Sequence, residues 1–287
     1  MNCDQRAIRF NCHGSSMVGI IDLPERPLPR GVLVVAGQPW SRLGAQRQFA
    51  MLARALARRG FAVMRFDRRG VGDSEGRDYN DSDVRAAVQE FCEQVPGVRE
   101  VVLMAPGSGT ANDDIVATAS ACARIDARVR ALLLLDPRRR GARGERPKTA
   151  HMLAAAATAP APIGAALFWR RSQPPRRQRA AGRALAGLAE QLCAFPGHVL
   201  VVAGADATHQ AARDSIDAGD AGDAGESNRP APARSELTQL RRLVERAQAD
   251  HRVRIVDASS ASGAADAGER PDADANAATC ASWMVSW

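Results

Sequence analysis

Short apolar runs rich in Val, Leu and Ile recur along the chain and alternate with stretches of helical periodicity. Near-continuous apolar strands are typical of a parallel sheet that is covered on both faces. The runs are Gly31–Gly37, Phe61–Asp67, Val98–Ala105, Val129–Asp136, His198–Gly204 and Val253–Ala258. Between them the pattern predicts helices at about Gln46–Arg59, Asp81–Val95, Asn112–Ile125 and Ser235–Gln248. This alternation predicts a doubly wound α/β domain with a mostly parallel sheet.

The same pattern divides the chain of 287 residues into four parts. An N-terminal β-hairpin is predicted from Ala7–Cys12 and Met17–Asp22, which flank His13-Gly14. It belongs with the first half of the core, residues 1–137. An Arg- and Ala-rich helical insert, the expected cap, spans residues 138–193. The second half of the core, 194–258, is followed by a low-complexity tail, 259–287, that ends in a Trp-containing segment.

Two segments of low complexity carry almost no large apolar residues. One is a polar linker at about 214–234, which contains three copies of Asp-Ala-Gly at Asp217–Gly225. The other is Ser259–Thr279, composed mainly of Ala, Asp, Ser and Gly. Neither segment can bury enough surface to offset its chain entropy, so both are expected to be disordered.

Positive charge is concentrated in one part of the chain. The net charge is +7, while Arg138–Arg183 alone holds twelve basic residues and one acid, Glu145. A solvated surface is the simpler interpretation, and an acidic partner, phosphates or an acidic membrane surface is the alternative. Aromatic residues are only 4%, and no nucleic-acid-binding motif is present, which argues against specific nucleic-acid recognition.

Cofactor and membrane signals are weak. The six cysteines form no C-x-x-C pair, and there is no G-x-G-x-x-G fingerprint, so no metal or cofactor is predicted. Scattered cysteines and the lack of a signal-like run in Met1–Phe10 predict a cytoplasmic protein with reduced thiols. Thr149–Trp169 lacks charged residues but is mostly Ala with two prolines, so no transmembrane span is predicted.

The stretch from Gly31 to Gly76 resembles the first half of an α/β-hydrolase domain, in which a strand leads into a Gly-containing loop and a helix. The next strand ends in Asp67-Arg68-Arg69-Gly70-Val71-Gly72-Asp73-Ser74. The Gln-Pro-Trp turn, the Arg-Gln-Phe of the first helix and the Arg-Phe-Asp strand end resemble the exosortase A system-associated hydrolase 1 family. The terminal Ser282–Trp287 (SWMVSW) resembles that family's ending as well. Proteins of this family are found in bacteria, beside exopolysaccharide and protein-sorting genes.

The resemblance implies an oxyanion hole made of backbone N–H groups. One donor follows the nucleophile, which here is Gly109, and the other comes from the loop after the first parallel strand. Gly37 and Gln38 are the candidates in that loop, because Pro39 has no N–H.

The expected nucleophile lies in the turn after Leu103–Ala105. In strict strand register the position falls on Gly107, and the family carries a Cys-Asp pair where this chain has Gly107-Ser108. A shift of one residue makes Ser108 the nucleophile, flanked by Pro106 and Thr110. The alternative for Ser108 is a cap of the following helix.

For the acid, α/β-hydrolases place the triad Asp after the strand that corresponds to His198–Gly204, which here indicates Asp206, with Asp136 as runner-up. The base should follow the last strand, yet Ser259 stands where the family has its His. His209, close behind Asp206, is the candidate substitute. His251 precedes the last strand and is expected at the opposite sheet edge, and His13 and His151 have no positional argument.

The resemblance implies a hydrolase that cuts an ester, thioester or related acyl bond of unidentified substrate through a nucleophile-elbow mechanism. The alternative, from another class, is a catalytically degenerate homologue that acts as a binding or scaffold protein. Loss of a triad nucleophile or base costs on the order of 10⁶ in kcat, so the residue that replaces the missing His decides between the two.

Overall fold

A computed structural model of the chain describes residues 3–36, 41–44, 47–77, 80–106, 111–135, 176–203, 232–247, 252–257 and 273–287. Its eight strands are β1 Cys3–Cys12, β2 Ser15–Pro24, β3 Arg30–Val34, β4 Val63–Phe66, β5 Glu100–Pro106, β6 Val129–Leu135, β7 His198–Ala203 and β8 Val253–Asp257. The helices are α1 Gln48–Ala57, α2 Asp81–Gln94, α3 Ala111–Ile125, α4 Arg176–Ala194, α6 Pro232–Arg246 and α7 Ala273–Val285. Every strand and helix that the periodicity predicts is present, with ends shifted by a few residues at most.

The eight strands form one sheet in the order β1-β2-β4-β3-β5-β6-β7-β8. β1 and β2 make the predicted hairpin, and β2 runs antiparallel to β4. All pairs from β4 to β8 are parallel. The prediction of a doubly wound, mostly parallel sheet is therefore confirmed.

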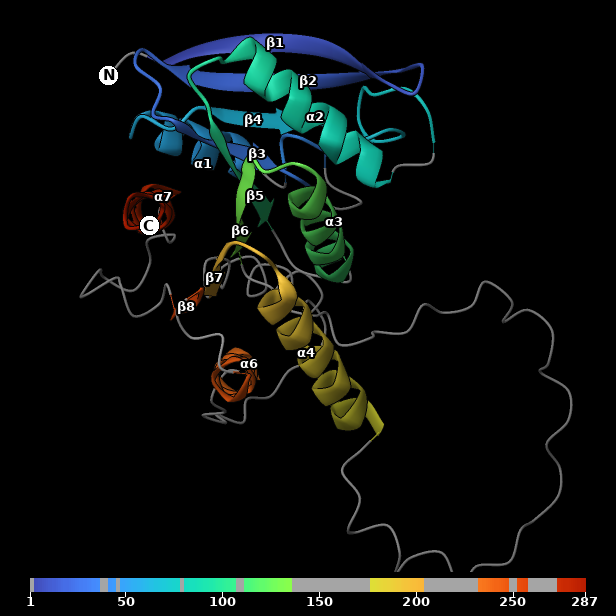
Figure 1. Cartoon of the computed structure of the whole chain (residues 1–287), viewed down its shortest axis with the longest axis vertical. Helices are drawn as coiled ribbons and strands as arrows, with labels where there is room; N and C mark the ends of the chain where they lie inside the picture. The colour runs from blue at the N-terminus through green and yellow to red at the C-terminus, as the bar shows by residue number, and fades with distance from the viewer. Residues whose placement is uncertain are drawn as a thin grey trace, which may run out of the picture.

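Helices cover both faces of this sheet (Figure 1). Alternation along β3 shows how the sequence divides the two cores: Leu33 and Val35 join one apolar cluster, while Val32 and Val34 join the other. The first cluster is completed by α2, α3, α4 and α6. The second is completed by α1 and α7. Burial of alternate residues on opposite faces follows from the period of two in a strand.

The predicted cap insert, 138–193, is described only in its last part. Residues 138–175 lie outside the described residues. The end of α4 buries Leu188, Ala189 and Leu192 in the same apolar cluster as β6 and β7. This helix is therefore one of the layers that cover the sheet.

The low-complexity tail contains a helix that the sequence did not indicate. The expectation of disorder across Ser259–Thr279 is wrong at its C-terminal end, where α7 begins at Ala273. Ala277, Cys280 and Ala281 are buried on the α1 face of the sheet. Small side chains give a weak hydrophobic signal in sequence but allow close packing between helices, which explains the error.

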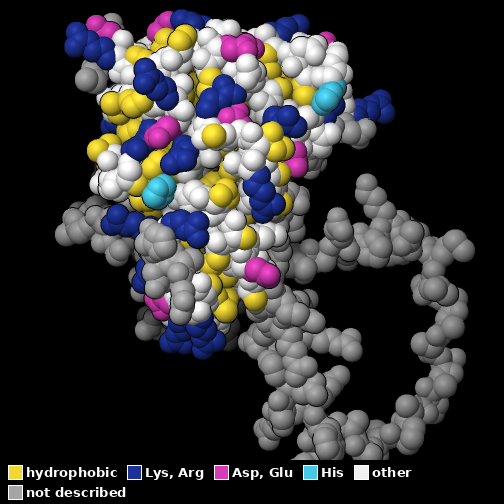
Figure 2. Space-filling model, viewed as in Figure 1, with side chains coloured by type: hydrophobic (Ala, Val, Ile, Leu, Met, Phe, Trp, Pro, Cys, Tyr) yellow, Lys and Arg dark blue, Asp and Glu magenta, His cyan; other side chains and the backbone are white. Residues whose placement is uncertain are grey.

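On the face of the molecule shown in Figure 2, the basic side chains of the described residues are spread among acidic and apolar ones. The side chains of Arg138–Arg183 lie outside the described residues, so a partner for that segment stays a prediction. No helix among the described residues is long and apolar enough to cross a membrane.

Candidate active site

The carboxyl ends of six parallel strands meet at one edge of the sheet, and every predicted site residue follows one of them. The register aligns these ends: Val34 lies opposite Met104, Pro106 opposite Leu135, and Leu135 opposite Val202. β5 lies between β3 and β6, and β7 follows β6. Ligand sites of open α/β sheets lie outside the carboxyl ends of the strands, so we take this edge as the candidate active site.

None of the predicted catalytic residues belongs to the described part of the chain. Gly37 and Gln38 follow Ala36, just beyond β3, and Ser108 and Gly109 fall between β5 and α3. Asp206 and His209 come after β7, and the alternatives Asp136, His151, His251 and Ser259 are likewise outside the described residues. The structure therefore describes the strands that lead to these residues and leaves their mutual geometry as a prediction.

His13 is the one alternative histidine that the structure describes. It is exposed in the turn between β1 and β2, with β4 and β3 between that hairpin and β5. Its backbone is left-handed, with φ 51°. A side chain at this outer position does not approach the end of β5.

The described part of the edge contains a buried carboxylate that sequence reasoning did not assign. Asp67 follows β4, the neighbour of β3, and its side chain is fully buried. Its Oδ1 accepts a hydrogen bond of 2.5 Å from the backbone N–H of Arg42, and its Oδ2 is paired with the Arg42 guanidinium. The backbone N–H of Asp73 donates to Oδ2 at 3.3 Å. Two signals could have identified Asp67, which are its position directly after a strand and its place in the Arg-Phe-Asp strand end.

The Arg42 side chain bridges two carboxylates, because it also donates to Asp73 at 2.7 Å. Burial of the guanidinium lowers its pKa, but the hydrogen bond to Asp73 and the nearby charge of Asp67 outweigh this, so the pKa of Arg42 is raised. Arg42 therefore stays charged, and it holds the loop after β4 to the segment that leads into α1.

Gly72 is required in this loop for a steric reason. Its φ is 56°, and a Cβ added there would lie 2.1 Å from Oδ2 of Asp67. The Gly-Val-Gly-Asp run that carries the family resemblance is thus explained locally, as the backbone shape that admits the Asp67 carboxylate.

A second buried ion pair lies beneath α1. Arg65 of β4 and Asp22 of β2 are each about 1% exposed, and the guanidinium donates to Asp22 at 2.9 and 3.1 Å. Gln5 donates to the other oxygen of Asp22 at 2.6 Å. Arg65 also donates to the backbone carbonyl of Arg42 at 3.1 Å, which links this pair to the Asp67 cluster.

A third carboxylate, Asp83 in the first turn of α2, fixes the loop after β4 from the opposite face of the sheet. It is fully buried and accepts from the backbone N–H and the side chain of Arg69 at 3.0 and 2.6 Å. The thiol of Cys12 lies 3.6 Å from the same carboxylate. Acidic groups at a helix N-terminus are also stabilised by the helix dipole.

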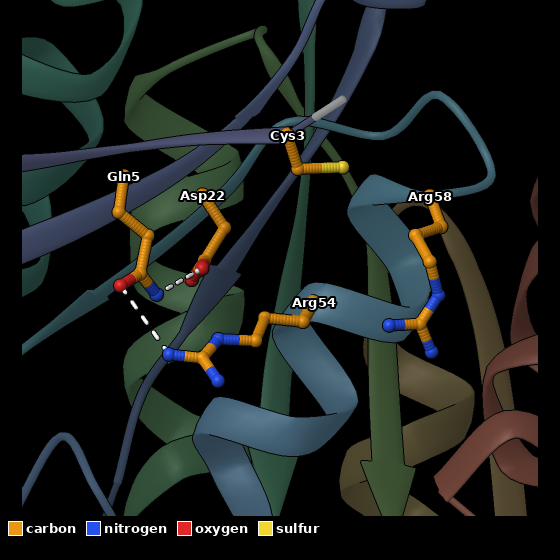
Figure 3. Close-up of a pocket in the computed structure, with 5 residues that line it drawn as sticks. All are labelled: Cys3, Gln5, Asp22, Arg54 and Arg58. Carbon is orange, nitrogen blue, oxygen red and sulfur yellow. Dashed lines mark hydrogen bonds between the residues drawn. The ribbon is translucent and has the colours of Figure 1, made fainter. Parts of the chain in front are cut away.

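The structure also describes a surface pocket of about 370 Å³, lined by Cys3, Gln5, Asp22, Arg54 and Arg58. Figure 3 shows Asp22 bound to Gln5, which in turn accepts from Arg54. Cys3 and Asp22 pair with Pro24 and Val63, and Val63 opens β4, so this pocket lies toward the amino ends of the parallel strands. Asp22 is already neutralised by Arg65, and the pocket therefore provides no catalytic carboxylate.

Two of the described cysteines are excluded as nucleophiles by their environment. Burial raises the pKa of Cys122 and of Cys280 to about 12. Thiols of that kind stay protonated and unreactive at neutral pH. Among the described residues, no group of His, Cys, Asp and Glu could hold a metal ion.

No protein-family model matches the chain, and no curated protein sequence matches it. Several solved structures do match the chain. The esterase Pf2001 of Pyrococcus furiosus aligns over 99% of this chain and 92% of its own, with a TM-score of 0.56 and 10% identity. Est1E of Butyrivibrio proteoclasticus, solved with ferulic acid, aligns over 97% and 98%, with a TM-score of 0.52 and 15% identity.

Other matches are partial. The α/β hydrolase GrgF from a Penicillium shares 19% identity over 47% of this chain, with a TM-score of 0.39, and less than half of its own length is spanned. The two full-length alignments, together with the sheet order, show that this chain has the α/β-hydrolase fold.

Proposed function

We propose that this chain is a hydrolase of ester, thioester or related acyl bonds whose nucleophile is Ser108, at the turn between β5 and α3. The observation that carries the proposal is the convergence of strand ends at one edge of an α/β-hydrolase sheet. β3, which leads to Gly37 and Gln38, is hydrogen-bonded directly to β5, which leads to Ser108. Neighbouring strands lie about 4.8 Å apart, so donors after β3 fall within reach of an oxyanion formed at the end of β5.

The spacing of β5 and β7 supports a triad. β6 alone separates them, which sets their backbones about 10 Å apart. An imidazole between a serine hydroxyl and a carboxylate, hydrogen-bonded to both, bridges a gap of that order. His209 and Asp206, both after β7, are the residues that we assign to these positions.

The proposed reaction has two stages. Ser108 Oγ forms a bond to the acyl carbon while His209 takes its proton, and Asp206 orients the imidazole. The oxyanion accepts hydrogen bonds from the N–H groups of Gly109 and of Gln38 or Gly37. His209 then returns the proton to the leaving alcohol or thiol, and water releases the acid by the reverse sequence.

Within this class, we assign the chain to the exosortase A system-associated type. Support comes from the Gln-Pro-Trp turn, the Arg-Gln-Phe and Arg-Phe-Asp motifs and the terminal SWMVSW. The assignment predicts a bacterial gene beside exosortase and exopolysaccharide genes, with a cytoplasmic product. A gene neighbourhood without an exosortase would contradict it.

Turnover of short-chain p-nitrophenyl esters tests the function. We expect Ser108→Ala to lower kcat by up to about 10⁶, to the level of the background reaction. Ser286→Ala is the matched control, because Ser286 is exposed beyond α7 and its hydroxyl donates to the carbonyl of the nearby Trp283. His209→Ala should match Ser108→Ala, and turnover unaffected by it would remove His209 as the base.

A wild-type chain without turnover would favour the alternative function of a degenerate homologue that binds without cleaving. The substitution of Ser259 for the family's histidine is the feature that favours this alternative.

A further inference from the structure

The Asp67–Arg42 cluster occupies the candidate active-site edge, yet the proposed chemistry does not use it. We propose that Asp67 is a positioning residue, which holds the chain directly after the Gly37–Gln38 loop and thereby sets where the oxyanion-hole donors lie. This inference rests on the proposed function for its catalytic consequence and on described contacts for the anchoring itself.

The first step is that Asp67 is buried and that both of its carboxylate oxygens accept hydrogen bonds. Its side chain is fully buried, and three donors from two chain segments converge on its two oxygens. A buried carboxylate that accepts several hydrogen bonds is costly to displace. It is therefore a fixed point against which a neighbouring segment can be held.

The second step is that both backbone groups of Arg42 are held by side chains of β4 or its end. The N–H of Arg42 donates to Asp67 at 2.5 Å, and its carbonyl accepts from Arg65 at 3.1 Å. Arg65 is itself buried and paired with Asp22. Because the backbone of Arg42 is bound on both sides, its position is set by β4.

The third step concerns the other end of the loop. Val35, two residues before Gly37, donates its N–H to Met104 of β5 at 2.8 Å. Arg42 comes four residues after Gln38. The donors of the proposed oxyanion hole thus lie in a short segment that is tied to β5 on one side and to Asp67 on the other.

The fourth step is that the loop after β4 fits closely around the Asp67 side chain. Gly72 has no Cβ, and any larger residue would meet the Asp67 carboxylate at 2.1 Å. Ser74, almost buried, donates to the carbonyl of Asp67 at 2.6 Å. The loop after β4 is shaped around Asp67, which is expected of a residue that positions its neighbours and not of a solvated surface acid.

Asp67→Asn tests the anchor in the full chain. The amide keeps the shape of the side chain but has a single acceptor oxygen, so it cannot serve all three donors. We expect hydrogen exchange at Arg42–Gly44 to accelerate by at least about tenfold, while β3 and β5 stay protected. On p-nitrophenyl esters, kcat should fall about tenfold to a hundredfold with KM changed by less than about twofold, because misplaced oxyanion donors act on the transition state.

Asp73→Asn is the matched control. Asp73 contacts the same Arg42 guanidinium, but its side chain is 70% exposed. Exchange and kcat should both stay within about twofold of wild type. If Asp67→Asn fails to fold, Arg42→Gln replaces it as the test variant. Arg42→Gln keeps the backbone hydrogen bond to Asp67, so the rise in hydrogen exchange should be smaller, about threefold.

Exchange at Arg42–Gly44 that is unchanged in folded Asp67→Asn, or in Arg42→Gln where it replaces that variant, would overturn the anchor. Faster exchange with an unchanged kcat would overturn the catalytic consequence. A wild-type chain that turns over no ester would reject the proposed function, and the exchange result would still accept or reject the anchor.

Discussion

The two edges of the parallel sheet use charged residues in different ways. At the carboxyl edge, Asp67 and Asp83 are fully buried, and each accepts backbone as well as side-chain hydrogen bonds from a neighbouring segment. At the amino edge, Arg30 pairs with Glu100 at 2.6 Å, and both side chains are partly exposed, at 21% and 32%.

At the amino edge, aromatic stacking accompanies this partly exposed ion pair. The Trp287 ring stacks on His198, with 4.5 Å between ring centroids, and the Arg30 guanidinium lies 4.0 Å above the Trp287 ring. Arg30 also donates to the backbone carbonyl of Met284. These contacts attach the end of α7 to the starts of β3 and β7.

The two kinds of contact constrain the backbone to different degrees. Buried, multiply bonded carboxylates define the backbone positions of loops, whereas stacking of the half-buried His198 and Trp287 rings attaches a helix with less positional constraint. Buried carboxylates of this kind hold the loop after β4, at the edge where the proposed site lies. Substitutions that disturb buried charge should therefore destabilise the protein more than substitutions in the aromatic cluster, and four predictions rank them.

The largest effect is expected for Asp22→Ala. It leaves the Arg65 guanidinium buried without its carboxylate, which costs about 3–5 kcal/mol of unfolding free energy. Urea unfolding measures the change. The double variant Asp22→Leu/Arg65→Met should be close to neutral, since it replaces the pair by apolar groups of similar volume. A double variant as unstable as the single one would contradict the assignment of the loss to an unpaired charge.

Gly72→Ala should cost less, about 2–3 kcal/mol, because it combines a left-handed backbone with a clash against Asp67. Gly14→Ala is the matched control: its φ is 81°, and a Cβ added there would meet nothing within 4 Å. The difference between the two in urea unfolding isolates the contact with Asp67. Equal losses would show that the carboxylate does not occupy the space beside Gly72.

At the amino edge, Trp287→Ala should cost about 1–2 kcal/mol, from lost stacking on His198 and from the lost cation–π contact with Arg30. Val285→Ala is the control, since Val285 is 68% exposed at the end of the same helix. Its effect should stay within about 0.5 kcal/mol. A Trp287→Ala variant as stable as that control would mean that the aromatic cluster does not hold α7.

The smallest effect concerns pH. Burial, followed by the charges of Arg130, Arg30 and Arg252, lowers the pKa of His198 below its ordinary 6.5, against an opposing influence from Glu100. The unfolded chain therefore binds the proton more readily than the folded one. The stability that neutral His198 contributes is complete above about pH 6.5 and is lost as the pH falls toward the lower folded value.

Melting temperatures between pH 7.5 and 5 measure this loss, and His198→Gln should make the profile flatter in that range. A wild-type profile with the same slope as that of His198→Gln would contradict the lowered pKa.

The elements of the fold were predictable because each core strand is an apolar run that needs no knowledge of its partner. The same holds for α1, where Phe49, Leu52, Ala53 and Leu56 share one face and are buried. α7 escaped prediction because its buried residues are mostly small, and the end of α4 was assigned to a cap although Leu188 and Leu192 belong to the core.

The site was predictable only in part, because its described interactions depend on contacts remote in sequence. In the sequence, Arg65 interrupts an otherwise apolar strand, and its partner Asp22 lies 43 positions away. Arg42 and Asp67 are 25 positions apart, and neither has a local pattern that reveals the pair. Ser108, Asp206 and His209 rest on the family resemblance and on the strand ends that precede them.

We have proposed that Ser108, which follows β5, is a reactive serine. Labelling of the full chain with a fluorophosphonate probe, followed by peptide mass analysis, tests it directly. We expect one phosphonylated residue, Ser108, and no adduct in Ser108→Ala. An adduct that persists in that variant, or a wild-type chain that takes up no probe, would contradict it.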